Sequence, residues 1–262
     1  MIDVVQYSVS MEQGLLIRRF KRHFSPLLHS GRKLIIGVHP KTRIFHPQYL
    51  VNENLRAAIE KIFFIERSKK SDEQILDVGC GLKPYSYLSN EQNWYGIDIY
   101  AGPKVDLVIN GTDKWDLKDN SFDAVLCTEV LEHAIDPDLV LDEIWRVLKP
   151  NGVAMITCPF IYGVHGEPND FRRYTYFGLL KMADKFEVLD YGMLGGVGSS
   201  LAINFNNWIS ASLAKNIWIN LALSPISWLI FSLVNFVAKG FDFIDKTNAF
   251  GTNSWISIRK SQ

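Results

Sequence analysis

A chain of 262 residues is long enough for one α/β domain with additions, and its 28 basic and 28 acidic side chains leave no formal net charge. The total charge therefore indicates no particular partner. The three cysteines are far apart and form no Cys-x-x-Cys pair, so they indicate neither a disulfide framework nor a metal site. The N-terminus lacks the basic-then-apolar pattern of a signal peptide, so we expect a reducing, cytoplasmic setting.

Basic side chains are concentrated near the N-terminus. Residues 13–52 contain no Asp or Glu, and their Lys and Arg residues are Arg18, Arg19, Lys21, Arg22, Arg32, Lys33, Lys41 and Arg43. Such an arm can bind phosphates, anionic lipid or nucleic acid, or it can be the solvated side of one or two helices. The sequence predicts a basic helical extension over residues 1–70 and leaves its partner open.

Two strand-like runs carry the acidic and glycine residues of a nucleotide site. The first run, ILDVGCG at 75–81, contains Asp77 and then Gly79 and Gly81, which allow a sharp turn and a close approach of the backbone to a ligand. The second run, WYGID at 94–98, ends in Asp98 about 20 residues later, where a ribose-binding carboxylate belongs in a βαβ unit. Together the two runs predict a nucleotide-type cofactor.

Strands and helices alternate through the middle of the chain, which predicts a parallel sheet with helices on both faces. One helix is expected to begin at Pro137 after Asp136, and the sequence KPNG at 149–152 predicts its stop and a turn. Thr175 is placed to cap a further helix over 176–184. The expected strands are residues 75–78, 94–97, 105–109, 124–127, 153–157, 186–191 and 254–258.

Four motifs resemble those of the class I S-adenosylmethionine-dependent methyltransferases, most closely their type 11 family. In chain order these motifs are ILDVGCG, YGIDI, DNSFDAVLCTEVLEH and IWRVLKPNGVAMITCP. The resemblance covers residues 74–186. It implies S-adenosyl-L-methionine as cofactor and an α/β fold with a Rossmann-like, seven-stranded, mostly parallel sheet and helices on both faces. We expect four parts: the basic helical extension at 1–70, the methyltransferase core at 71–192, an apolar helical insertion at 193–250, and the final strand at 251–262.

The resemblance also implies which residues hold the cofactor. The backbone at Gly79 and Gly81 and the carboxylate of Asp77 would hold its methionine part. Asp98 would accept hydrogen bonds from the two ribose hydroxyls, because a carboxylate offers only acceptors to two neighbouring donors. Ile99 would lie against the adenine.

Three further cofactor positions depend on loops that follow other strands. In the family an acid usually precedes the position of Asp123 by roughly a dozen residues, but here that position is Gly111. Asp113, two residues later, is therefore the candidate for the edge of the adenine, with an ordinary loop acid as the alternative. Cys127 and Glu129 follow the fourth strand and are expected near the methionine part.

Candidate catalytic and substrate residues follow the fourth and fifth strands. His133 could act as a general base near pH 7, although the Glu–His pair is common across the family whatever the substrate, so a cofactor-loop role stays open. His165 could take a proton from a hydroxyl, with Glu167 or Asp170 orienting it and Arg173 holding an anionic group such as phosphate.

The loop at 159–175 resembles a segment of those type 11 enzymes that are often associated with sugar or cell-surface polymer pathways. A lid held by internal hydrogen bonds is the alternative interpretation of these residues. No metal site is expected, because His165 and Glu167 have no further ligand pair at a suitable spacing.

About 60 residues separate the last two strands, and a connection this long is expected to have structure or purpose of its own. Residues 217–238 contain no charged side chain and are long enough to span a bilayer, which needs roughly 20 apolar residues. Their polar residues, and the need to return the last strand to its sheet, favour two helices broken near Pro225. These helices could dock on a membrane through residues 199–240, pair with another subunit, cover the active site, or form a buried hairpin.

Three hypotheses about function remain. The first is a methyltransferase, cytoplasmic and peripheral on the inner face of the membrane, that O-methylates a sugar, a glycan or a lipid-linked acceptor; prenylated quinones would also fit. The second is transfer to nucleic acid or protein, disfavoured because an Asn/Asp-Pro-Pro-Tyr/Phe motif and basic–aromatic interleaving are lacking. The third is a non-catalytic, membrane-associated scaffold, against which the intact cofactor motifs argue. A homodimer is compatible with each.

Overall fold

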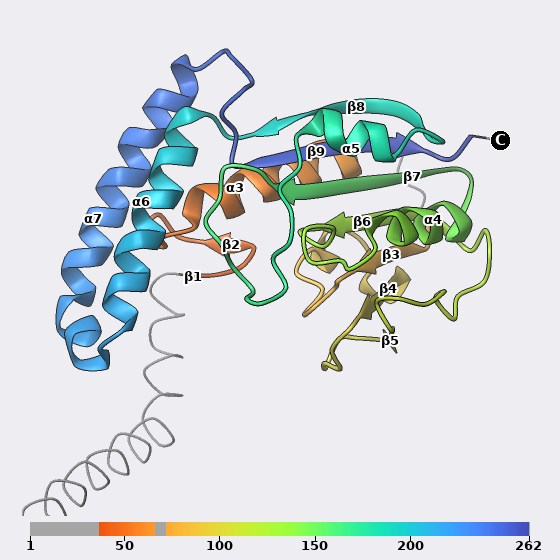
Figure 1. Ribbon diagram of the computed structural model, residues 1–262, viewed down its shortest axis with the longest axis horizontal. Coiled ribbons are helices and arrows are strands. Elements are labelled where there is room, and N and C mark those ends of the chain that lie inside the picture. The colour runs from red at the N-terminus through yellow and green to blue at the C-terminus, as the bar shows by residue number, and fades with distance from the viewer. Residues whose placement is uncertain (1–36, 66–71, 262) are drawn as a thin grey trace, which may run out of the picture.

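The computed structural model describes residues 37–65 and 72–261, so most of the predicted basic arm lies outside the described residues. Its centre is a seven-stranded sheet in the order β5-β4-β3-β6-β7-β9-β8, in which β9 runs antiparallel to both of its neighbours (Figure 1). The predicted mostly parallel α/β sheet is confirmed. Its strands are β3 (Ile75–Val78), β4 (Trp94–Asp98), β5 (Leu107–Val108), β6 (Phe122–Thr128), β7 (Leu148–Pro159), β8 (Glu187–Leu194) and β9 (Asn253–Arg259).

Elements outside the sheet lie before it, on its two faces and between its last two strands. A small hairpin of β1 (Gly37–Val38) and β2 (Lys41–Thr42) comes first. The helical elements are α3 (Tyr49–Ala58), which continues as the π-helix η1 (Ile59–Ile65), the short 3₁₀ turns η2 (Ser86–Leu88) and η3 (Glu91–Asn93), α4 (Pro137–Val147), α5 (Tyr176–Met182), α6 (Val197–Ala214) and α7 (Ile217–Ile244).

Alternate residues of the strands point to opposite faces of the sheet, and each face has its own core. Leu76 and Val125 pack on the face that α4 and α5 cover, with Ile144 of α4 and Leu179 of α5. Neighbouring residues such as Ile75 pack on the other face, under α3 and η1, which contribute Leu55, Ile59 and Phe63. Helices therefore cover both faces, as the alternation of strands and helices predicts.

The local signals for helix ends are correct at two places. Asp136 accepts a hydrogen bond from the Leu139 amide at 3.0 Å, and Pro137 is the first residue of α4. Thr175 accepts one from the Gly178 amide at 3.1 Å and begins α5, which ends at Met182, two residues earlier than expected. The predicted turn at 149–152 lies inside β7, where Asn151 has a φ of 65°.

The insertion forms two antiparallel helices, but the predicted break near Pro225 is wrong. α6 ends at Ala214, and α7 runs for 28 residues with Pro225 inside it. The helices are separated at Asn216, whose side chain accepts hydrogen bonds from the amides of Trp218 and Ile219 and so begins a new helix. Hydroxyls of Ser224 and Ser227 donate to carbonyls of the same helix, which supports its continuation through the proline.

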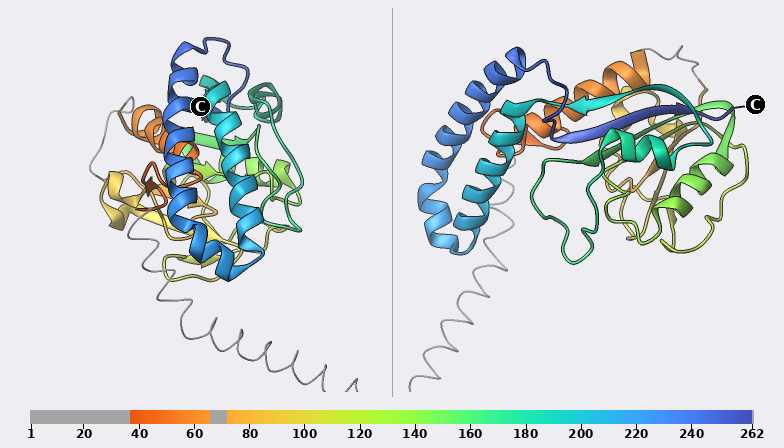
Figure 2. Two further views of the ribbon diagram at one scale, coloured as in Figure 1. Left: turned by 90° about the vertical axis from the view of Figure 1, so that its left-hand side faces the viewer. Right: turned by 45° about the horizontal axis from the view of Figure 1, so that its top comes forward.

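Two buried asparagines attach this helical pair to the segment before α3. Asn206 of α6 donates to the Pro47 carbonyl at 3.2 Å and to Asn235 Oδ1 at 3.1 Å. Asn235 of α7 donates to the Ile44 carbonyl at 2.8 Å. Both asparagines are fully buried, so these bonds fix one part of the pair to the body, while the pair stands away from the sheet (Figures 1 and 2).

The contact between α6 and α7 gives a test with a matched control. A Cβ at Gly198 would overlap the Ala238 carbonyl oxygen, whereas a Cβ at Gly240 would meet no heavy atom within 4 Å. Gly198→Ala is therefore expected to lower the free energy of unfolding by about 1–3 kcal/mol, the usual cost of overpacking. Gly240→Ala should raise it by about 0.5–1 kcal/mol, because alanine suits a helix interior better than glycine. Denaturant unfolding of both variants measures these changes, and equal effects would contradict the described helix contact.

Candidate functional site

The glycine loop after β3 has the conformation and the space that a ligand-binding turn needs. Gly79 and Gly81 have φ values of 68° and 49°, in the left-handed region that favours glycine. A Cβ at Gly79 would lie 2.5 Å from Val130 Cγ2, so this glycine lets the loop pack against the segment after β6. A Cβ at Gly81 would meet nothing within 4 Å, so the backbone there borders open space.

Asp77 is a buried carboxylate that lacks a complete set of partners. Its residue is 2% exposed, and Oδ2 has no hydrogen-bond donor among the described residues. Burial raises the pKa of Asp77 to about 7, an effect that Lys83 opposes and Asp98 reinforces. A buried acceptor without a donor is costly, and an ammonium group or a water molecule held at the loop would supply one.

Asp98 and Ile99 end β4 beside the glycine loop. Asp98 Oδ2 accepts a hydrogen bond from the Gly81 amide at 3.0 Å, and Oδ1 accepts one from the Tyr100 amide at 3.0 Å. Ile99 is 48% exposed, and a Cβ at Gly111 would lie 3.6 Å from its Cγ2. The structure therefore brings the glycine loop, Asp98, Ile99 and the loop at 110–113 together.

Asp113 lies in that last loop, exposed, and accepts a hydrogen bond from Asn110 Nδ2 at 2.8 Å. Its side chain is available at the surface next to the Ile99 region, and its predicted role at the adenine edge stays a prediction. The buried Asp77 acceptor, the open space over Gly81 and the paired oxygens of Asp98 fit a cofactor that carries an amine and a ribose.

Cys127 lies in β6 and Glu129 directly follows that strand, but the two side chains have different environments. Cys127 is fully buried in β6, and burial raises the pKa of its thiol well above the usual range, so only its backbone is suited to a ligand. Glu129 has a φ of 55°, and its carboxylate accepts hydrogen bonds from Thr157 Oγ1 and Asn253 Nδ2, both at 2.8 Å. Burial, and then Glu132, raise the pKa of Glu129.

Glu132, His133 and His165 converge at this edge of the sheet. Glu132 Oε1 lies 3.5 Å from His133 Nε2 and 3.8 Å from His165 Nε2. The two imidazole rings meet edge to face with their centroids 4.8 Å apart. One ligand atom from each residue lies within 4.8 Å of the other two, which the sequence spacing of these residues does not predict. Both predicted catalytic histidines therefore belong to one cluster, centred on a glutamate that had no assigned role.

The loop between β7 and α5 holds His165 in place through an internal ion pair. Asp170 accepts a hydrogen bond from the His165 amide at 2.9 Å, and its Oδ2 lies 3.3 Å from His165 Nδ1. Arg173 donates to Asp170 at 2.5 and 2.7 Å and to the Gly163 carbonyl at 3.1 Å. This bond to Arg173 is the main cause that lowers the pKa of Asp170.

The three predicted substrate residues of this loop, Asp170, Arg173 and Glu167, have different surroundings in the structure. Asp170 contacts His165, and its predicted role in orienting that histidine stays a prediction. Arg173 braces the loop from within, so its predicted role in binding an anionic substrate stays a prediction, while Glu167 is exposed on the same loop.

Tyr162 is a site residue that the sequence analysis did not identify. Its hydroxyl accepts a hydrogen bond from Gln48 Nε2 at 2.8 Å, and the carbonyl of the preceding Pro47 accepts one from Asn206 of α6 at 3.2 Å. Its ring lies against the ring of His165, with 5.1 Å between centroids. Tyr162 therefore joins the histidine cluster to the helical pair, through partners that are distant in sequence and give no local signal.

Comparison with known proteins gives a match to a family model and a relative that is similar over part of its length. Residues 76–156 match the family model that is described as a methyltransferase domain. The uncharacterized protein MJ0638 of Methanocaldococcus jannaschii is 33% identical over 93 residues, which are 33% of this chain and 41% of that protein. The match thus spans less than half the length of this relative.

Several solved structures share the fold at low sequence identity. The [4+2]-cyclase SpnF is 18% identical with a TM-score of 0.52, covering 80% of this chain and 81% of that one. Coclaurine N-methyltransferase is 13% identical with a TM-score of 0.50, covering 78% and 72%. Phosphoethanolamine N-methyltransferase 2 of Haemonchus contortus is 17% identical with a TM-score of 0.50, covering 80% and 53%.

These proteins carry different chemistry on one fold, so the fold alone does not identify an acceptor. The family match contains the glycine loop, Asp98 and the strand that leads to Glu129, which are the parts with the geometry of a cofactor site. S-adenosylmethionine is the cofactor of this domain. Residues 76–156 are thus a methyltransferase domain of the type 11 family, in a chain with the class I fold of S-adenosylmethionine-dependent methyltransferases.

Proposed function

We propose that the protein transfers the methyl group of S-adenosylmethionine to a hydroxyl oxygen of an amphiphilic acceptor, such as a sugar, glycan or lipid-linked molecule at a membrane surface. The observation that carries this proposal is the apolar helical pair, which reaches the site loop through Pro47, Gln48 and Tyr162. The cofactor supplies a methyl group that its sulfonium already activates. The protein must therefore bind the cofactor, position the acceptor and accommodate its proton.

The residues of the site divide these tasks. Asp77, the glycine loop and Asp98 would hold the cofactor, as their geometry suits. The acceptor hydroxyl would lie at the cluster of Glu132, His133 and His165, since its imidazoles are partly open to solvent, with side chains 28% and 33% exposed. An imidazole is suited to moving a proton near pH 7.

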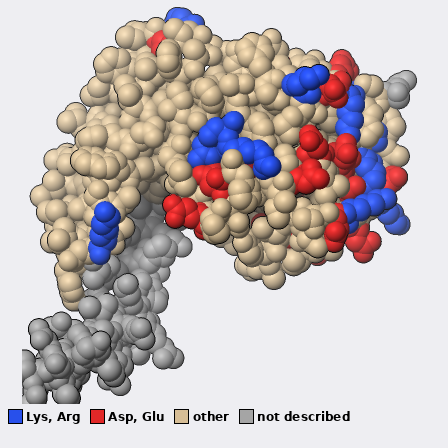
Figure 3. Space-filling view, viewed as in Figure 1, with Lys and Arg blue, Asp and Glu red and all other residues tan. Residues whose placement is uncertain are grey.

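The exposed surface of α6 and α7 supports a membrane location for the acceptor. Leu229, Phe236 and Trp208 are 70%, 69% and 65% exposed, and further large apolar side chains lie between them. The most apolar 18-residue window of α7 has a mean hydropathy of 1.9, yet only 28% of that window is buried. Figure 3 shows this part of the surface almost without charged side chains. An uncovered apolar surface of this kind marks an interaction site.

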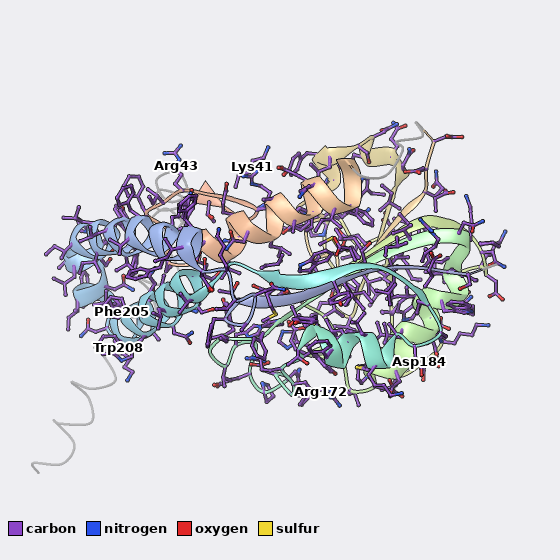
Figure 4. All side chains as sticks on the ribbon, turned by 90° about the horizontal axis from the view of Figure 1, so that it is seen from above. Lys41, Arg43, Arg172, Asp184, Phe205 and Trp208 are labelled. Atoms are coloured by element: carbon purple, nitrogen blue, oxygen red, sulfur yellow. The ribbon has the colours of Figure 1, made fainter. Side chains whose placement is uncertain are left out.

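By length and composition α7 could cross a membrane, but its connections favour docking. After α7 the chain returns to β9, which pairs with β7 and β8 in the sheet. Both helices would therefore enter one leaflet from the same side, as an interfacial hairpin does. Arg43 is exposed near one edge of the pair, and Phe205 and Trp208 lie along the other (Figure 4), so a cationic group and aromatic groups flank the helices. We place the protein on the cytoplasmic face, where anionic lipids attract basic side chains.

The ribose assignment can be tested by calorimetry with S-adenosylmethionine. Asp98→Ala is expected to weaken binding by about 10- to 100-fold, since a hydrogen bond to a charged group contributes about 1.5–3 kcal/mol. Asp184→Ala removes an exposed carboxylate just after α5 and should leave the affinity unchanged. Equal affinities in the two variants would remove Asp98 from the cofactor site.

The acceptor class can be tested with cofactor labelled on its methyl group and a membrane-containing lysate of the source organism. We expect label in the lipid or glycan fraction after organic extraction, because the helical pair would bring the site to the membrane. Label confined to nucleic acid or protein would support the second hypothesis and reject this proposal. Absence of both transfer and cofactor binding would support the scaffold.

Membrane docking can be tested by sedimentation with vesicles of anionic phospholipid. Phe236→Glu on α7 is expected to lower the partition coefficient at least about tenfold, because burial of one such side chain contributes about 1.5–3 kcal/mol. Phe177→Glu on α5 is the matched control, since Phe177 is 65% exposed and Phe236 is 69% exposed. A wild-type dimer that Phe236→Glu dissociates, without vesicle binding by either protein, would show instead that a second copy covers this surface.

A further inference from the structure

The carboxylate of Glu132 is the least explained group of the site. The residue is 0% exposed, and neither carboxylate oxygen has a hydrogen-bond donor in the described part of the chain. Burying a carboxylate without such donors is strongly unfavourable unless an opposite charge lies against it. The nearest groups are the two imidazole Nε2 atoms at 3.5 and 3.8 Å, which is too far for a good hydrogen bond. A cation at their common centre would attract all three groups.

The other nitrogen of each imidazole is already engaged. His133 Nδ1 lies 2.5 Å from the Asn169 carbonyl oxygen. His165 Nδ1 lies 3.3 Å from the Gly163 carbonyl oxygen and 3.3 Å from Asp170 Oδ2. Carbonyl and carboxylate oxygens only accept, so Nδ1 carries the hydrogen in each neutral ring and Nε2 keeps its lone pair. Both lone pairs therefore belong to the atoms that face Glu132.

This arrangement is the one that proteins use around metal ions. A ligating histidine usually donates its second ring N–H to a carbonyl or carboxylate, which fixes the ring and the tautomer. Here Asn169, Gly163 and Asp170 provide those acceptors, and Arg173 in turn holds Asp170. We propose that Glu132, His133 and His165 bind a divalent first-row transition-metal ion such as Zn²⁺ or Mn²⁺.

The distances require a small contraction of the cluster. Ligand atoms about 2.1 Å from one ion in tetrahedral geometry lie roughly 3.4 Å apart. The three atoms here lie within 4.8 Å of one another, so movements of about 1 Å close the set around an ion. The histidine side chains are partly exposed and lie on loops, which gives an entry path and allows the movement.

The ligand types select the class of ion. Two imidazole nitrogens and one carboxylate suit zinc, manganese, iron or copper, whereas Mg²⁺ and Ca²⁺ prefer oxygen ligands. Three protein ligands also leave a position for another group, as in catalytic rather than structural sites. Glu129 lies nearby but is occupied by Thr157 and Asn253, so it is not needed as a ligand.

The metal site would give the proposed methyl transfer a way to activate the acceptor hydroxyl, and this role rests on the proposed function. An acceptor hydroxyl bound to the ion would lose its proton to water more readily, because a divalent cation lowers the pKa of an oxygen that it binds. His165 would then be a ligand, and the predicted general base would be unnecessary. Metal binding itself can be measured without any methyl transfer.

The test is a titration of the full chain, freed of metal by a chelator, with Co²⁺, whose visible absorption reports nitrogen and oxygen ligands. Wild type is expected to bind one equivalent. His165→Ala and Glu132→Gln should each weaken that binding at least about 100-fold, since loss of an outer partner alone already costs 10- to 100-fold. Zn²⁺ should displace Co²⁺, and Mg²⁺ at the same concentration should not.

His46→Asn is the control for loss of a histidine outside the cluster. His46 accepts a hydrogen bond from the Gln48 amide at 3.0 Å, and an asparagine can accept the same bond. This variant should bind Co²⁺ like wild type. Cofactor affinity, measured on every variant, shows that each remains folded, because the cofactor residues lie outside the cluster.

Two results would overturn the metal site. One is equal Co²⁺ binding by wild type, His165→Ala and Glu132→Gln, and the other is a wild type that binds cofactor but no Co²⁺. Methyl transfer by a protein that binds no Co²⁺ would reject the metal site and keep the proposed function. Co²⁺ binding lost in the two cluster variants, together with absence of transfer to any fraction, would support the metal site and reject the proposed function.

Discussion

The antiparallel pairing of β9 between β7 and β8 is the constraint from which the arrangement of the site follows. β8 ends at the carboxyl edge of the parallel strands, and β9 must begin at that same edge because it runs the other way. Any insertion between them therefore emerges where Asp77, Asp98 and Glu129 end their own strands. The helical pair lies beside the site because of this topology, and Asn253, the first residue of β9, reaches Glu129 for the same reason.

The sequence predicts well those features that neighbouring residues determine. The caps at Asp136 and Thr175 depend on amides within three residues, and the strands depend on short apolar runs, so both are predicted near their observed places. The break near Pro225 fails because a cap at Asn216 and nearby serine hydroxyls outweigh the local effect of a proline. The glycine loop is predicted because its conformation needs glycine, and its φ values confirm that need.

The parts of the site that the sequence does not predict are contacts between distant segments. Tyr162 meets Gln48 across 114 positions, and Asn253 meets Glu129 across 124. Glu132 and His133 are adjacent, but His165 comes from another loop, so no ligand spacing is visible along the chain. A motif search finds ligands that one helix or loop presents together. It does not find a cluster that the sheet edge assembles.

Three buried or enclosed carboxylates at this edge are stabilised in different ways, and the differences indicate what each is for. Glu129 accepts hydrogen bonds from two neutral donors, Thr157 and Asn253, although burial and Glu132 still raise its pKa. Asp77 has one oxygen without a donor within the described part of the chain, beside the glycine loop, where the cofactor amine is predicted to bind. Glu132 has no hydrogen-bond donor on either oxygen among residues 37–65 and 72–261, and it faces two imidazole Nε2 atoms.

The carboxylate of Glu132 faces two imidazole nitrogens, whereas that of Glu129 faces a hydroxyl and an amide. A buried carboxylate that faces lone pairs is stable when a cation, either a proton on an imidazole or a metal ion, lies between them. Acceptor oxygens face both Nδ1 atoms, which favours the Nδ1–H tautomer of each neutral ring. A single divalent ion satisfies the carboxylate and both Nε2 atoms at once, whereas one added proton satisfies a single imidazole and leaves the second without a partner.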